Sequence, residues 1–293
     1  MPRLHQGVGN ERRRHEDSIV SNRTIVITGA SDGIGAAAAQ RLNEDGNDVV
    51  IVGRSPKKTT EVARALNVAH YVADFASLED VRVLTAKLRA DYPRIDVLVN
   101  NAGGVMGERT LTIDGNELTT QVNYLAPFLL TNLLLDILSD SVATVIATSS
   151  LANRFAGTVD LDDFTLAHRY TPMRAYGRAK LMDILFTREL NRRYHQVGIS
   201  AAAFHPGTVR TSFSAEYGGA VSFVYRSFTK HLLRTPAQGA ETLVWLATSR
   251  PGRDWVSGEF YKDKTIMKAT RQAYDPILAN DLWELSATLT AIT

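Results

Sequence analysis

Short runs of β-branched and aliphatic residues alternate with longer amphipathic stretches from Thr24 onward. This alternation is typical of repeated βα units and predicts a parallel sheet. The runs 49–52 and 97–99 are continuously apolar, as expected for parallel strands that are buried on both faces. No linker-like or repetitive tract interrupts the interior of the chain. The pattern therefore predicts one doubly wound α/β domain over residues 23–293, with helices on both faces of a central parallel sheet.

The elements of this domain can be placed along the chain. About seven strands are expected, at 24–28, 48–52, 70–73, 97–100, 143–148, 200–204 and 259–261. Helices are expected at 34–45, 57–66, 78–91, 115–138, 174–196, 236–249 and 276–289. Two segments, 153–172 and about 206–235, are longer than ordinary loops and follow strands whose carboxyl ends should border a ligand crevice. We expect the second segment to be a substrate loop.

The charge of the chain is nearly balanced, with 33 Lys and Arg against 31 Asp and Glu. The excess lies in residues 1–23, which hold five arginines and three acids. We therefore expect residues 1–22 to form a disordered basic segment. Because the rest of the chain is neutral overall, we expect no nucleic-acid partner.

The chain contains no cysteine, which excludes disulfides, thiolate metal sites and a cysteine nucleophile. Its seven histidines form no close ligand pair, so no metal site is predicted. The cysteine count is compatible with a cytoplasmic location. The longest uncharged run, 118–135, contains Gln121, Asn123 and Asn132, which would be unfavourable in hydrocarbon. We therefore expect a buried helix there and no integral membrane segment.

A glycine-rich turn joins the first predicted strand to the first predicted helix. Gly29, Gly33 and Gly35 allow a tight turn, close approach of the backbone to a pyrophosphate and close packing of the helix on the strand. A purely structural turn is the alternative. Arg54 follows the second predicted strand, where an acid would favour NAD(H) and an arginine suits a 2′-phosphate. The sequence thus favours NADP(H), with a surface arginine paired to a nearby acid as the alternative.

Tyr176 and Lys180 are four positions apart in the predicted helix 174–196 and so project from one face. An ammonium beside a phenol stabilises the phenolate and lowers its pKa from about 10 towards working pH, as a general acid/base requires. Ser149, Ser150 and Asn123 are polar residues predicted to border the same crevice. Their convergence would give an acid/base site.

In combination, these motifs resemble the short-chain dehydrogenase/reductase family, which implies a Rossmann-type domain. The resemblance covers about residues 24–261 and the tail 274–290, and it includes the Asn-Asn-Ala-Gly element at 100–103 and the Pro-Gly-x-x-x-Thr stretch at 206–211. It implies a catalytic tetrad of Asn123, Ser150, Tyr176 and Lys180, with Ser150 preferred over Ser149. It also implies that the following residues bind the cofactor: Gly29, Ser31, Asp32, Gly33, Ile34, Gly35, Arg54, Asp74, Phe75, Asn101, Ala102, Gly103, Tyr176, Lys180, Pro206, Gly207, Val209 and Thr211.

Within the family, the chain resembles the retinol dehydrogenase and protochlorophyllide reductase-like branch. The interval between Ser150 and Tyr176 is 26 residues, and it contains the acidic stretch 160–163. The segments 185–190 and 205–209 resemble retinol dehydrogenases in particular. Asp32 stands where some NADP-dependent members carry a basic residue, and its charge would repel a nearby 2′-phosphate.

The resemblance implies hydride transfer between NADP(H) and a carbonyl or alcohol, with Tyr176 as general acid/base. It assigns Ser150 to the reacting oxygen, Lys180 to the cofactor ribose and Asn123 to a bound water. A catalytically idle NADP(H)-sensing or scaffold protein is one alternative, and a ring C=C reductase of the protochlorophyllide reductase type is another. The predicted substrate loop contains the aromatic residues Phe213, Tyr217, Phe223, Tyr225 and Phe228. They suggest a small-molecule substrate that is apolar and fairly bulky. Alternatively, they pack the loop on the sheet. The helix 123–138 could pack on the sheet or join subunits of a homodimer or homotetramer.

Overall fold

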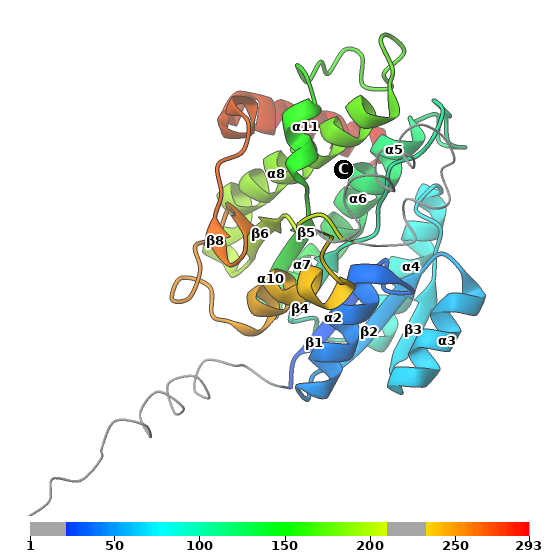
Figure 1. Cartoon of the computed structure of the whole chain (residues 1–293), viewed down its shortest axis with the longest axis vertical. Helices are drawn as coiled ribbons and strands as arrows, with labels where there is room; N and C mark the ends of the chain where they lie inside the picture. Colours follow the sequence, from blue (N-terminus) through cyan, green and yellow to red (C-terminus); the bar gives the residue numbers. More distant parts are fainter. Residues whose placement is uncertain (1–21, 210–232, 293) are drawn as a thin grey trace, which may run out of the picture.

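All seven predicted strands are present in the computed structural model, which describes residues 22–209 and 233–292 (Figure 1). They belong to one sheet of eight strands in the order β3-β2-β1-β4-β5-β6-β7-β8. The strands are β1 (Thr24–Thr28), β2 (Asp48–Gly53), β3 (Ala69–Val72), β4 (Val97–Asn100), β5 (Thr144–Thr148), β6 (Ser200–Phe204), β7 (Glu259–Lys262) and β8 (Thr265–Ile266). The expected basic segment, except Asn22, and the part of the substrate loop from 210 to 232 lie outside the described residues.

The seven predicted strands run parallel, and β8 is an antiparallel addition at the edge. Asp263 and Lys264 join β7 to β8 with φ values of 52° and 61°, as a two-residue hairpin turn requires. A two-residue strand is too short to show a hydrophobic period, so the sequence did not predict it. In the centre of the sheet, Val26 lies opposite Val50 on one side and Leu98 on the other, and all three are buried.

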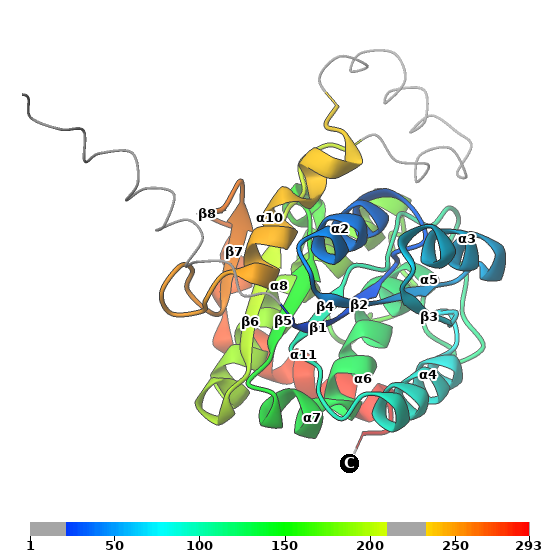
Figure 2. The ribbon, with the colours of Figure 1, turned by 90° about the horizontal axis from the view of Figure 1, so that it is seen from below.

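Helices cover both faces of the sheet, which confirms the doubly wound architecture (Figure 2). One face carries α2 (Gly33–Glu44), α3 (Pro56–Leu66) and α10 (Pro236–Thr248). The other carries α4 (Leu78–Asp91), α6 (Ala126–Leu133), α7 (Leu135–Asp140), α8 (Pro172–Tyr194) and α11 (Pro276–Leu289). Short 3₁₀ turns occur at η2 (Leu151–Phe155), η3 (His195–Val197) and η5 (Arg271–Tyr274). No helix in the described parts of the chain combines the length and apolarity needed to cross a bilayer.

The predicted helix 115–138 is wrong as a single element. It consists of α5 (Leu118–Thr120), a π-helical turn η1 (Gln121–Leu125), α6 and α7, with a break at Leu134. Pro127 has no N–H to donate to the carbonyl four residues earlier, which favours a widened turn immediately before it. The side chains of Thr131 and Asn132 donate hydrogen bonds of 2.8 Å to carbonyls one turn earlier. Such bonds bend helices, and here they immediately precede the break at Leu134.

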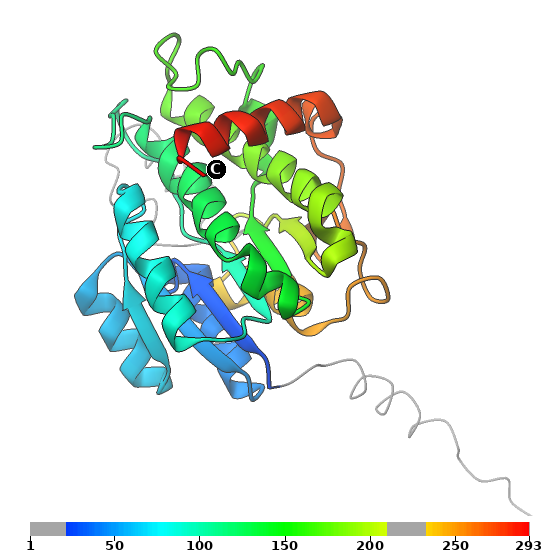
Figure 3. The same cartoon turned by 180° about the vertical axis from the view of Figure 1, so that it is seen from behind.

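The helix α11 lies across α6 and α8 on the outer side of this layer (Figure 3). The ring of Trp283 lies 5.0 Å from that of Phe128 and stacks on Phe186 at 5.6 Å. Tyr124 and Ser286 share a buried hydrogen bond of 2.8 Å. Burial within the chain was one of the two interpretations of the apolar segment 123–138. Its apolar residues belong to the core or pack against it, and α11 covers part of them.

Candidate active site

The turn between β1 and α2 has no room for side chains at two of its glycines. A Cβ on Gly29, whose φ is +65°, would lie 2.7 Å from the Cα of Ala102, and one on Gly35 would lie 2.5 Å from the carbonyl oxygen of Gly29. The turn is therefore packed directly against the backbone that follows β4. The first N–H groups of α2 at this edge suit an anion such as a pyrophosphate.

Asp32 begins α2 as its N-cap, and its Oδ1 accepts a hydrogen bond of 2.7 Å from the Gly33 N–H. The carboxylate is thus stabilised by the helix terminus while its residue stays exposed. A Cβ on Gly53 would lie 3.0 Å from the Ser31 hydroxyl, so the end of β2 contacts the same turn. Arg54, the next residue, is exposed on that rim.

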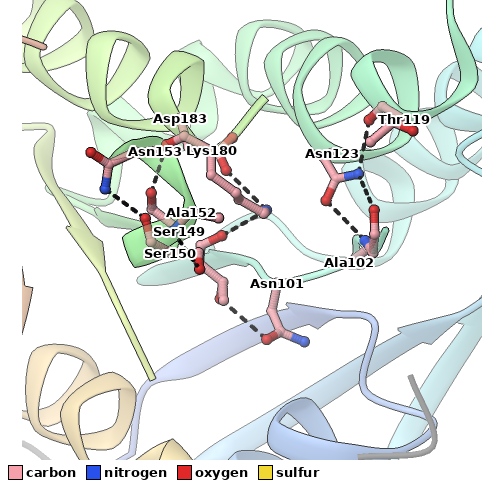
Figure 4. Close-up of polar contacts among 12 residues, drawn as sticks. Asn101, Ala102, Thr119, Asn123, Ser149, Ser150, Ala152, Asn153, Lys180 and Asp183 are labelled. Carbon is pink, nitrogen blue, oxygen red and sulfur yellow. Dashed lines mark hydrogen bonds and ion pairs between the residues drawn. The ribbon is translucent and has the colours of Figure 1, made fainter. Parts of the chain in front are cut away.

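Asn101 links the carboxyl ends of three neighbouring strands, β1, β4 and β5 (Figure 4). Its Nδ2 donates to the carbonyl oxygens of Thr28 at 3.0 Å and Gly29 at 3.2 Å, and its Oδ1 accepts from the Thr148 hydroxyl at 3.1 Å. The backbone N–H of Ala102 donates to the Thr28 hydroxyl at 3.0 Å. These bonds give Asn101 a structural role, and they fix the backbone that borders the glycine turn.

Asp74 and Phe75 follow β3 at the far end of the same edge. Asp74 Oδ1 accepts from the Ala76 N–H at 3.0 Å, and Phe75 is 4% exposed. The Gln121 amide, which belongs to the π-helical turn, reaches the Phe75 carbonyl at 3.4 Å. The segment is therefore held in place at the carboxyl end of β3.

Lys180 is buried beneath the end of β5, on α8 (Figure 4). Its Nζ donates to the Thr148 carbonyl at 2.9 Å and pairs with Asp183 Oδ2 at 3.0 Å. Burial raises the pKa of Asp183 to about 6, against the opposing attraction of Lys180. Asp183 is not among the predicted site residues, although its i,i+3 spacing from Lys180 is a signal that the sequence contains.

Tyr176 lies on the same helix face as Lys180, whose Nζ is 5.5 Å from the centre of the tyrosine ring. The two serines after β5 differ in their surroundings. The Ser149 hydroxyl is buried and donates to the Lys180 carbonyl at 2.6 Å. Ser150 is partly exposed and its hydroxyl accepts from the Ala152 N–H at 3.1 Å, so its own proton remains available to a substrate. This difference favours Ser150 as the catalytic serine.

Asn123 lies in the π-helical turn and its amide contacts the loop that follows β4 (Figure 4). Its Oδ1 accepts from the Gly104 N–H and its Nδ2 donates to the Gly104 and Thr119 carbonyls, each at 2.8 Å. A Cβ on Gly103 would lie 2.3 Å from the Asn123 Oδ1 and 3.4 Å from the Lys180 Nζ. The loop, Asn123 and Lys180 therefore meet around one backbone position.

The segment after β6 lies over the start of α2. A Cβ on Gly239 of α10 would lie 2.6 Å from a Val209 methyl group and 3.3 Å from Ile34. Gly207, at φ +85°, lies directly beneath the Arg234 side chain. Pro206 belongs to the same described stretch, whereas Thr211 lies outside the described residues. These contacts bring the predicted residues Ile34 and Val209 together.

His205 lies at the end of β6 and is 6% exposed. Burial, assisted by the positive charges of Lys262 and Arg234, lowers the pKa of His205 to about 4. The imidazole is therefore neutral at physiological pH. In the described parts of the chain, no group of three or more histidines and acids is placed to hold a metal ion.

The family model for short chain dehydrogenase matches residues 23–220. The chain belongs to the short-chain dehydrogenase family. This short-chain dehydrogenase is 43% identical over 272 residues to a Streptomyces protein provisionally named daunorubicin C-13 ketoreductase DnrU, covering 90% of this chain and 91% of the relative. It is 32% identical to human retinol dehydrogenase 14 over 304 residues, 96% of this chain and 90% of the relative.

Among solved structures, the fold resembles an NADP complex of RhlG from Pseudomonas aeruginosa. The TM-score is 0.66 at 25% identity, over 83% of this chain and 94% of that one. The expected family and its retinol dehydrogenase-like branch are confirmed. This short-chain dehydrogenase is thus an oxidoreductase that acts on CH–OH or C=O groups, and its family uses a nicotinamide cofactor.

Proposed function

We propose that this short-chain dehydrogenase transfers a hydride between NADP(H) and the carbonyl or alcohol of a bulky apolar substrate, with Tyr176 as general acid/base. The observation that carries the proposal is the contact of Lys180 with Tyr176 at the end of β5. The Lys180 ammonium lies 5.5 Å from the centre of the Tyr176 ring and donates to the Thr148 carbonyl, and the partly exposed Ser150 follows that strand end by two residues. A sensor would need the glycine turn but not this acid/base arrangement.

The glycine turn fits a dinucleotide. Gly29 and Gly35 have no space for a Cβ, and they lie on either side of the N-terminus of α2. We infer that this turn would hold the pyrophosphate and that Lys180 would hold the nicotinamide ribose. When bound, the cofactor supplies or accepts the hydride.

The side chains supply the proton transfer and the positioning. Tyr176 would donate a proton to the substrate oxygen during reduction, and the Ser150 hydroxyl would bond the same oxygen. The Lys180 ammonium would favour the phenolate form of Tyr176. The bonds from Asn123 to Gly104 support a positioning role for that amide, and the water proposed at Asn123 stays a prediction.

NADP(H) is proposed over NAD(H) because Arg54 is exposed beside the turn and Gly53 precedes it where an acid would select NAD(H). The Asp32 carboxylate accepts from the Gly33 N–H, so the helix terminus offsets part of its charge. The NADP complex of RhlG shows that a related fold carries this cofactor.

The substrate is proposed to be a ketone or aldehyde on a bulky apolar skeleton. One relative is named for the C-13 ketone of daunorubicin and another for retinol. Daunorubicin and retinal are therefore the first compounds to test as substrates. The cytoplasmic location, the homodimer or homotetramer and the covering role of the substrate loop stay predictions.

The proposal is tested by single-turnover reduction of these carbonyls with NADPH. Tyr176→Phe should leave NADPH affinity nearly unchanged and slow hydride transfer by about 10²–10⁴-fold. Tyr194→Phe is the control, because Tyr194 ends the same helix and packs on Trp283. Equal rates for wild type and Tyr176→Phe would remove Tyr176 from catalysis. Tight NADPH binding without turnover of any carbonyl would favour a catalytically idle sensing protein. Reduction of a ring C=C bond would favour a reductase of the protochlorophyllide reductase type.

A further inference from the structure

Asp183 lies one helical turn after Lys180, and the two form an ion pair inside the protein. Their charged atoms are 3.0 Å apart, and the side chains are only 5% and 7% exposed. Burying two charges removes them from water at a cost that their attraction often fails to recover, so such a pair is a poor device for stability alone. Its place under the proposed acid/base site points to a role there.

Few other charges act on this carboxylate. In the described residues, the groups with an electrostatic interaction at Asp183 are Lys180 on its own helix and Tyr124 on the π-helical turn. Tyr124 is buried and hydrogen-bonded to Ser286, and burial raises its pKa, so the phenol stays neutral. The electrostatic partner of Asp183 with a charge of opposite sign is therefore Lys180.

The number of donors on the ammonium limits what Lys180 can do. An ammonium carries three N–H bonds. The Thr148 carbonyl takes one at 2.9 Å and Asp183 takes a second at 3.0 Å (Figure 4). The third remains for another acceptor, and Gly103 adds no side chain next to Nζ, where a Cβ would lie 3.4 Å away.

We propose that Asp183 is a positioning residue of the active site, whose carboxylate fixes the Lys180 ammonium against β5 and leaves one N–H bond for a ligand in the crevice. That this ligand is a cofactor hydroxyl rests on the proposed function. The pairing itself rests on geometry. Because the carboxylate also opposes the field of the ammonium, it moderates how strongly Lys180 favours the phenolate of Tyr176.

The first test compares wild type with Asp183→Asn in NADPH titrations and in pH profiles of single-turnover reduction. The amide keeps an acceptor but removes the charge. NADPH should bind about fivefold to thirtyfold more weakly, because the ammonium is less well oriented. The alkaline limb should move to lower pH by roughly half a unit or more, because the unopposed ammonium favours phenolate.

The control is Glu189→Gln on the same helix. Glu189 is 1% exposed and pairs with Arg192 at 2.5 Å and Arg193 at 2.6 Å. This variant should be less stable yet keep the wild-type alkaline limb and NADPH affinity. If Asp183→Asn matches wild type in both measurements, or shifts no more than Glu189→Gln, the positioning role is overturned.

The second test needs neither cofactor nor substrate. Lys180→Met leaves the Asp183 carboxylate buried without its partner, whereas Lys180→Met/Asp183→Asn removes both charges. At neutral pH the double variant should therefore unfold at a higher temperature than Lys180→Met. An equal or lower unfolding temperature would overturn the pairing, even if Asp183→Asn alone fails to fold. If wild type binds no NADPH, the proposed function fails while this comparison still decides the pairing.

Discussion

Replacing Gly35 by alanine should weaken cofactor binding more than it weakens the fold. The new Cβ would lie 2.5 Å from the Gly29 carbonyl oxygen and 2.6 Å from the Asn101 amide nitrogen, so backbone has to shift. Overpacking of this kind costs about 1–3 kcal/mol. Alanine recovers about 1 kcal/mol of helix propensity within α2. We therefore expect the free energy of unfolding to fall by about 0–2 kcal/mol.

The substitution should reduce NADPH affinity more than stability, because the cofactor binds only to the wild-type conformation of the turn. In the free variant the turn relaxes away from the new methyl group, and binding has to restore the strained geometry. A strain of about 1–3 kcal/mol corresponds to a dissociation constant for NADPH raised by roughly 5-fold to 150-fold. Asn101 links the turn to the end of β5, so a shift also reaches the acid/base side of the crevice.

The assay is a calorimetric titration with NADPH together with thermal unfolding of the same samples. Gly46→Ala is the matched control, because Gly46 has φ +83° but nothing within 4 Å of its Cβ position. That variant should lose about 1 kcal/mol of stability from backbone strain and bind NADPH as wild type does. Wild-type NADPH affinity in Gly35→Ala would refute the assignment of this turn to the cofactor.

Three further outcomes are expected. Arg54→Ala should reduce the preference for NADPH over NADH by about 10-fold to 150-fold, measured by titration with both, and an unchanged ratio would exclude a contact with the 2′-phosphate. The pKa of His205 is lowered from 6.5 to about 4, so stability should be lost as pH falls through that window, with a slope of up to about 1.4 kcal/mol per unit. Denaturant titrations of His205→Leu should show a flatter dependence, and an equal slope would contradict this. Trp283→Ala should cost about 3–5 kcal/mol by the same method, more than Trp245→Ala, which removes a half-buried ring.

Seven of the eight strands and most helices could be predicted from the sequence because their signals are local. Continuous apolar runs marked β2 and β4, and Pro56 and Pro276 mark the first turns of α3 and α11. The segment 115–138 was predicted as one helix because no charge interrupts it from 118 to 135, while its division depends on one proline and on side-chain bonds to carbonyls a turn away. Hydrophobic period alone does not register such interruptions.

For the candidate site, the sequence determined which residue types were present and in what order. The spacing of Tyr176 and Lys180 on one helix already placed them on one face. The resemblance preferred Ser150 over Ser149, whereas the physical difference between the two serines came only from the structure. The Ser149 hydroxyl donates to the Lys180 carbonyl, and the Ser150 hydroxyl accepts from a backbone N–H. The contact of Asn123 with Gly104 is likewise tertiary, because it joins a helix to a loop 19 positions away.

The ion pair of Lys180 and Asp183 depends on both the sequence and the tertiary structure. The sequence determined that the two side chains lie one turn apart on the same helix, and so that they can meet. Only the tertiary structure decided that they meet out of water, because β5 and the π-helical turn pack over that part of α8. An exposed ion pair at this spacing would contribute little to stability. In a buried pair, removal of one charge leaves the other buried without a partner, which destabilises the protein.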